Sequence, residues 1–152
     1  MTLVDQVKSA LYSPTFTGRL TEHGIFIGSN SSALNLESAG ASALPAIESV
    51  LLEEQKSIDY CALVDRIGSI LNSYFSITHE CGYGGARDFV LRLEQPLRAI
   101  ALAEICCVWG SSGGLNRLRP VPAWLRELLD LLECNEEYAA IVQRIRDCII
   151  RQ

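Results

Sequence analysis

Hydrophobic side chains recur along this chain at helical spacing, and the segments that carry them recur at a fixed interval. Aligned segments begin at positions 60, 99 and 138, so successive copies are 39 residues apart. They are Tyr60 to Ile67, Ala99 to Cys106 and Tyr138 to Ile145. A period of this length is typical of an array of short helical units, because each unit then packs against the next one along the chain.

The helix expected before each copy keeps the same interval. Its apolar positions fall at i, i+3 and i+4, which is one face of an amphipathic helix. The aligned sets are Ile47, Ala86 and Leu125, then Val50, Phe89 and Leu128, then Leu51, Val90 and Leu129. We therefore predict an all-α fold in which antiparallel helix pairs at residues 43–81, 82–120 and 121–152 stack side by side.

Two further positions repeat within the second helix of each predicted pair. Alanine recurs where it is expected to let neighbouring helices approach closely, at Ala62, Ala101 and Ala140. A polar position recurs away from the apolar stripe, at Asp65, Glu104 and Gln143. We call the second set the polar ladder.

Residues 1–152 are expected to form one domain, and the first 42 carry a weaker pattern. A short helix from Thr2 to Tyr12, capped by Thr2, precedes a segment that is either a long loop or a small hairpin over 16–27. Further helix caps are expected at Ser42, at either Asp59 or Ser57, and at Asn135. Residues 97–109 are apolar on nearly every face, so we expect them to form the most buried helix.

The second helix of the first pair has the clearest apolar stripe in the chain. Its inward positions are expected to be Tyr60, Leu63, Val64, Ile67, Ile70, Leu71 and Tyr74. Gly68 interrupts this helix at a cost of about 1 kcal/mol relative to alanine. We expect the missing side chain to admit a neighbouring one. Trp124, in the third pair, is expected to lie in the core.

Composition and charge disfavour two classes of function. The chain is 49% hydrophobic and 20% charged, as folded domains usually are. Its net charge of −5 disfavours a nucleic-acid-binding solenoid, because phosphates attract basic faces, and leaves only a local patch of Arg117, Arg119 and Arg126 for that role. No apolar run reaches the roughly 20 residues of a membrane span, and the N-terminus has no signal-peptide pattern. We expect a cytoplasmic protein without membrane contact.

The six cysteines lack the spacing of a metal site, since none forms a C-x-x-C pair. We expect them to be small buried hydrophobes without disulfides, and we expect no metal and no cofactor. We assign no catalytic residue.

The alternative to a chain without catalytic residues is a small-ligand or enzymatic site in the loop at 79–87. Its residues would be His79, Glu80, Cys81, Tyr83 and Arg87, with Glu80 or Cys81 as the reactive group.

The predicted pairs resemble the HEAT-like α-solenoid repeats over about residues 43–150. Ala43-Leu44-Pro45-Ala46-Ile47 is similar to the start of their first helix. In Gln95-Pro96-Leu97-Arg98-Ala99 an arginine precedes an alanine-rich helix, as at the start of their second helix. The position of Arg98 is Asp59 in the first pair and Glu137 in the third, which departs from that pattern.

The resemblance implies a binding role, because proteins of this family mostly act as scaffolds whose second helices line a concave surface. We therefore expect a non-enzymatic adaptor, inhibitor or immunity-type protein that binds another protein. The candidate contact residues are Asp65, Glu104 and Gln143 of the polar ladder, with Asn72, Tyr83 and Arg87. An acidic ladder favours a partner with a basic surface, and an exposed end of the array would permit a homo-oligomer.

Overall fold

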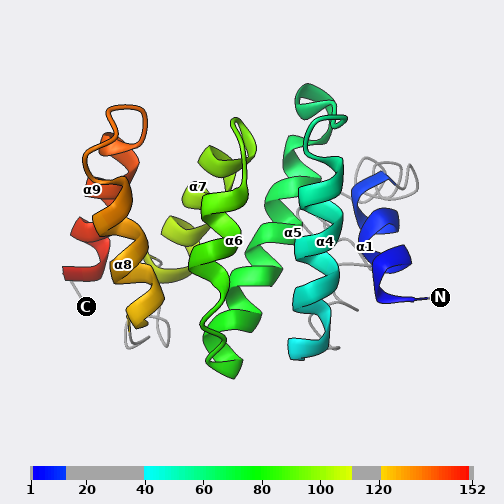
Figure 1. Cartoon of the computed structure of the whole chain (residues 1–152), viewed down its shortest axis with the longest axis horizontal. Helices are drawn as coiled ribbons and strands as arrows, with labels where there is room; N and C mark the ends of the chain where they lie inside the picture. The colour runs from blue at the N-terminus through cyan, green and yellow to red at the C-terminus, as the bar shows by residue number, and fades with distance from the viewer. Residues whose placement is uncertain (1, 13–39, 111–120, 151–152) are drawn as a thin grey trace, which may run out of the picture.

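The computed structural model describes residues 2–12, 40–110 and 121–150, and these residues form helices and turns without any strand (Figure 1). The prediction of an all-α fold is confirmed for this part of the chain. The candidate hairpin at 16–27, together with Arg117 and Arg119, lies outside the described residues. The helices are α1 (Leu3–Tyr12), the 3-10 turn η1 (Gly40–Ser42), α4 (Ala43–Glu54), α5 (Tyr60–Cys81), α6 (Ala86–Arg92), α7 (Leu97–Gly110), α8 (Ala123–Leu132) and α9 (Ala139–Ile150).

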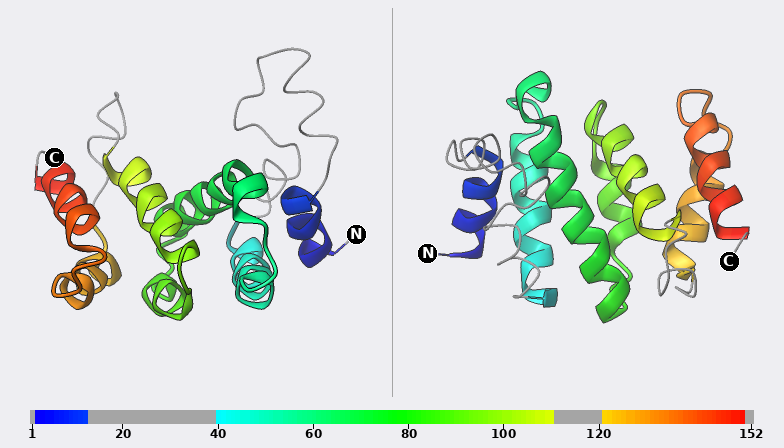
Figure 2. Two further views of the ribbon diagram at one scale, coloured as in Figure 1. Left: turned by 90° about the horizontal axis from the view of Figure 1, so that it is seen from above. Right: turned by 180° about the vertical axis from the view of Figure 1, so that it is seen from behind.

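The helices after residue 42 lie in two rows (Figures 1 and 2). Helices α4, α6 and α8 form what we call the front row, which faces the viewer in Figure 1, and α5, α7 and α9 form the back row. In the back row α7 packs against both α5 and α9, and in the front row α6 packs against α8. Helix α1 covers one end of the molecule by packing against α4 and α5.

The front-row helices bury the faces that the sequence pattern predicted. All nine aligned positions, from Ile47, Val50 and Leu51 to their counterparts in α6 and α8, are at most 2% exposed. Removal of this apolar surface from water is the main favourable contribution to folding, at about 25 cal/mol per Å². The prediction that these helices are amphipathic, with the aligned positions on the buried face, is therefore confirmed.

The back-row helices follow their predicted pattern less closely. In α5, Ile67, Ile70, Leu71 and Tyr74 are buried as expected, but Val64 is 44% exposed. Val64 lies near the N-terminus of the helix, where Cys61, Ala62 and Asp65 are exposed as well. The prediction that Val64 points inward is wrong, because the described helices leave this side of the first turns of α5 exposed.

The aligned alanines do not share one environment either. Ala101 is fully buried because it lies on α7, the middle helix of the back row. Ala140 is exposed on α9, which ends the row, and Ala62 is exposed in the first turn of α5. The prediction that helices approach closely at all three alanines is therefore wrong, because only Ala101 is buried between helices.

Helix α7 is not the most buried element. Six of its 14 residues are buried, against six of 12 in α4 and five of 10 in α8. Ala99, Ala103 and Cys107 are exposed at i, i+4 and i+8, so one stripe of α7 faces away from the protein. The described helices that pack against α7 leave this outer stripe exposed.

Two of the four residues expected to cap helices do so, Thr2 and Asp59. The Asp59 carboxylate accepts a hydrogen bond from the backbone N–H of Ala62 at 3.3 Å. Thr2 and Asp5 form a reciprocal capping box, in which each side chain accepts from the other's backbone N–H. Asn135 accepts from the N–H of Glu137 at 3.0 Å within the turn before α9, which begins only at Ala139, so the prediction that Asn135 caps this helix is wrong. Ser42 makes no side-chain cap, because η1 leads directly into α4 with helical dihedral angles.

An aromatic cluster joins the two rows at one end of α5 and α7. Trp124 of α8 stands edge-on to Trp109 of α7, with ring centres 5.6 Å apart, and stacks with Phe75 of α5 at 6.1 Å. Trp109 is fully buried and Trp124 is 6% exposed. The prediction that Trp124 belongs to the core is confirmed.

Candidate functional site

The polar ladder has its best-defined contact where α7 crosses α5. Glu104 lies against Gly68, and a Cβ atom at Gly68 would be only 3.2 Å from the Glu104 Oε2 atom. One turn further along α5, the Asn72 amide donates to Glu104 Oε1 at 3.1 Å. The glycine thus admits a neighbouring side chain, as predicted, and that side chain is a carboxylate of the ladder.

Partial burial gives this carboxylate an unusual protonation equilibrium. Removal from water raises the pKa of Glu104 above its usual value, and the hydrogen bond from Asn72 offsets only part of that effect. When folding raises the pKa of a carboxyl, binding of its proton stabilises the folded state. This stabilisation is complete at pH values below the unfolded-state pKa, and it is lost as the pH rises through the folded-state pKa. Ionised Glu104 therefore slightly lowers the free energy of unfolding at neutral pH.

Glu104→Gln is expected to raise the melting temperature at pH 7 by roughly 1–3 °C, because the neutral amide removes the cost of partly burying a charge. Below about pH 4, where the carboxyl of the wild type is protonated as well, the two proteins should melt at similar temperatures. Melting curves between pH 3.5 and 8 check this expectation. A difference that is independent of pH would mean that ionisation of Glu104 is not the cause.

The other two members of the ladder are exposed, and they differ in their surroundings. Asp65 precedes Gly68 and Asn72 by three and seven residues, so all three lie on one face of α5. Gln143 lies on α9, where its amide donates to Asp147 at 2.9 Å within the same helix. Asp65, Asn72 and Glu104 are thus brought to one region of the back row, while the hydrogen bond of Gln143 lies within α9.

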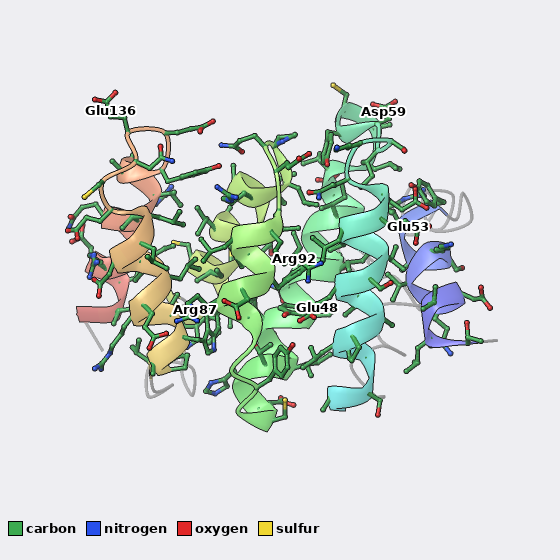
Figure 3. All side chains as sticks on the ribbon, viewed as in Figure 1. Glu48, Glu53, Asp59, Arg87, Arg92 and Glu136 are labelled. Atoms are coloured by element: carbon green, nitrogen blue, oxygen red, sulfur yellow. The ribbon has the colours of Figure 1, made fainter. Side chains whose placement is uncertain are left out.

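Tyr83 lies elsewhere, in a hydrogen-bonded group on the front-row side. Its hydroxyl donates to Glu48 Oε2 at 2.8 Å, and the same oxygen accepts from the fully buried Tyr74 at 2.6 Å. Glu48 projects from α4 towards α6 (Figure 3). Desolvation, followed by the adjacent carboxylate, raises the pKa of Tyr83 to about 12 and raises that of Tyr74 further. Both phenols therefore stay protonated at physiological pH and act as donors that hold α4, α5 and the turn before α6 together.

Arg87 also belongs to the front row. Its guanidinium pairs with Asp88 in α6 and with Glu127 in α8, and all three side chains are substantially exposed (Figure 3). Exposed ion pairs of this kind contribute about 0–1 kcal/mol each. The predicted contact residues therefore divide into two groups, with Tyr83 and Arg87 on the front row and the polar ladder with Asn72 on the back row.

The alternative site at 79–87 is spread along the end of α5 and the turn after it. The His79 ring stands edge-on to Trp109 with ring centres 6.0 Å apart, whereas Glu80 and Cys81 are exposed at the helix terminus. Gly82 closes the helix in the left-handed conformation, with φ at 71°. Among the described residues, no group of three or more potential ligands has the placement of a metal site.

Two contacts that the sequence pattern did not indicate connect neighbouring segments. Arg98 donates to the carbonyls of Val90 and Leu91 at the end of α6, and its guanidinium lies 5.6 Å from the centre of the Tyr138 ring. Gln55 accepts from the backbone N–H of Glu94 at 2.8 Å, which is 39 residues further along the chain. No sequence signal indicated the Gln55 contact, because the 39-residue interval makes the two positions equivalent without specifying that they touch.

The cysteines occupy different environments from the predicted ones. None of the six is buried. Cys61, Cys81, Cys107 and Cys134 are exposed, and Cys106 and Cys148 are half-buried. The prediction of small buried hydrophobes is wrong, because these cysteines lie at helix ends or on the outer side of the back row rather than in its apolar stripe.

The molecule presents two surfaces of different character, a front row rich in ion pairs and a back row with a polar ladder beside small side chains. None of the described helices combines the length and the hydropathy that crossing a bilayer requires. We compared the chain with protein-family models, with curated proteins and with solved structures, and none of them matches it.

Proposed function

We propose that this chain is a non-enzymatic adaptor, inhibitor or immunity-type protein that binds another protein through the outer face of α5, α7 and α9. On this proposal the helices act as three stacked pairs of a HEAT-like solenoid, with the back row as the binding side. The burial of all nine aligned front-row positions supports such an array, because each front-row helix then uses an equivalent face for the core.

The observation that carries the proposal is the composition of the outer back-row face. Asp65 is exposed, and Glu104 is held half-exposed beside it by Gly68 and Asn72. On α7, Glu104 adjoins the exposed stripe of Ala99, Ala103 and Cys107. Side chains this small leave the helix backbone close to the surface, so a partner can approach closely.

The charge of this face favours a partner with a basic surface. Complementary charges steer two proteins together and fix their register, and they do so most strongly when the charges are not already neutralised. Asp65 is exposed on α5, and the Glu104 carboxylate is neighboured by an uncharged amide. Arginine or lysine side chains of a partner would pair with these two carboxylates.

The test is the charge reversal Asp65→Lys, compared with the matched reversal Glu53→Lys. Glu53 is an exposed acid of α4 on the front-row side (Figure 3). Partners are first captured on the immobilised wild-type protein from native extract, identified and purified. We expect Asp65→Lys to bind the purified partner roughly five- to tenfold more weakly, with a shallower salt dependence, because it removes one rim charge pair. Glu53→Lys should bind like the wild type.

Melting curves separate binding from folding in this experiment. Both substitutions are at exposed positions, so each should change the stability by less than about 0.5 kcal/mol. Glu104 is left unchanged here because its contacts with α5 would couple charge reversal to the fold. Equal weakening by the two reversals, or binding that depends on Arg87 and not on Asp65, would contradict the proposed face.

A further inference from the structure

A groove of about 530 Å³ runs between α7 and α9 on the back row. Its walls bring together thiols from two helices that are distant in sequence and one positive charge. The α7 side contributes Cys106, Cys107 and Gly110, and the α9 side contributes Ile141, Arg144 and Cys148. The groove is open to solvent, so small solutes can reach these side chains.

The Cys106 and Cys148 thiols meet over Gly110. Gly110 follows Cys106 by one helical turn, and its lack of a side chain lets Cys148 approach α7 closely. A Cβ atom at Gly110 would be 2.9 Å from the Cys148 Sγ atom and 3.7 Å from the Cys106 Sγ atom. Both sulfur atoms thus lie within 4 Å of one point beside the Gly110 backbone. Both are half-buried on helices that pack together, so their separation is set by the fold.

We propose that Cys106 and Cys148 are a redox-sensitive pair that hydroperoxides oxidise to a disulfide, which links α7 to α9 across the floor of the groove. Disulfide formation requires the two sulfur atoms to approach to about 2.05 Å, and the close packing of α9 against α7 at Gly110 favours that approach. This inference concerns a modification of the chain and does not depend on the proposed protein-binding role.

The chemistry balances with a hydroperoxide as the only co-reactant. The thiolate of one cysteine attacks the terminal oxygen of the peroxide, which cleaves the O–O bond, forms a sulfenic acid and releases hydroxide, or alkoxide from an organic peroxide. The second cysteine, as its thiolate, attacks the sulfenic sulfur, so that the S–S bond forms and hydroxide leaves and takes up a proton to become water. With hydrogen peroxide, two thiols and one peroxide yield one disulfide and two waters, and the sulfurs together lose two electrons.

The surroundings of the pair make it distinct from the other cysteines. Cys107 is next to Cys106 in sequence but is exposed, on a different side of α7. Cys61 and Cys81 lie at opposite ends of α5, and Cys134 follows α8. Burial, followed by the neighbouring Cys148, raises the pKa of Cys106, so this cysteine is mostly a thiol at neutral pH and reacts with a peroxide through its small thiolate fraction. Arg144 opposes this effect and stabilises the thiolate when it forms.

The experiment uses the purified full chain, fully reduced and then treated with hydrogen peroxide at low protein concentration. Remaining thiols are alkylated, and the protein is digested with trypsin without reduction. We expect the number of free thiols to fall by two and the peptide 99–117 to become linked to the peptide 147–151, in a monomer that dithiothreitol restores. Because Cys106 and Cys107 share one peptide, single variants assign the bond.

Cys107→Ser should form the linked peptides as the wild type does, whereas Cys106→Ser and Cys148→Ser should lose them. Linked peptides that persist in Cys106→Ser would assign the bond to Cys107 and overturn the proposal. A wild-type protein that yields only sulfenic or sulfinic acids, or only links between molecules, would overturn it as well. Far-UV circular dichroism of each serine variant confirms that the loss reflects the missing thiol and not a loss of structure.

Discussion

Trp109→Ala is expected to lower the free energy of unfolding by about 3–5 kcal/mol, the usual cost of truncating a buried tryptophan. Trp109 is fully buried on α7 and touches the rings of His79 in α5 and Trp124 in α8. The substitution therefore leaves a cavity where three helices meet, and close-packed surroundings fill such a cavity only in part. Equilibrium urea unfolding, followed by far-UV circular dichroism, measures the loss.

Two further variants make this measurement specific. Leu131 is a large apolar side chain that is 58% exposed on α8, so Leu131→Ala should cost less than about 0.5 kcal/mol. Trp109→Phe keeps an aromatic ring in the cluster and should cost less than the alanine variant. A Trp109→Ala protein that is as stable as Leu131→Ala would mean that the aromatic cluster does not join the two rows.

Glu48→Ala is expected to destabilise the fold by about 2–3 kcal/mol, chiefly because it leaves a buried hydroxyl without an acceptor. Tyr74 is fully buried and donates to the Glu48 carboxylate at 2.6 Å. Tyr83 shares this acceptor but is partly exposed, so water can replace Glu48 there. The same urea titration measures the loss.

A double-mutant cycle isolates the part that arises from the orphaned hydroxyl. Tyr74→Phe removes the donor, so Glu48→Ala should cost considerably less in that background than in the wild type. Glu48→Gln keeps an acceptor and should cost about 1 kcal/mol, the net value of a typical hydrogen bond. If Glu48→Ala costs the same with and without the Tyr74 hydroxyl, the hydrogen bond between them contributes nothing to stability.

The polar contacts of the candidate site were predictable only in part. The sequence placed Asp65, Asn72 and Glu104 on helices of one row, and Gly68 indicated that a neighbouring side chain would enter α5 there. It did not indicate that Glu104 fills this space, because a period of 39 aligns equivalent residues and does not specify which side chains meet between helices. For the same reason Tyr83 and Arg87 were grouped with the ladder, although their partners, Glu48 and Glu127, belong to the front row.

By itself, the sequence determined the helices and the faces that their apolar side chains share, because helical periodicity and capping are local properties of the chain. The nine aligned front-row positions and the Asp59 cap follow from these local rules. Only the tertiary structure decided which predicted faces are covered, since Val64 and the stripe of Ala99, Ala103 and Cys107 would suit an interior but face outward. It also decided that Cys106 and Cys148 meet over Gly110, because that contact depends on how α9 packs against α7.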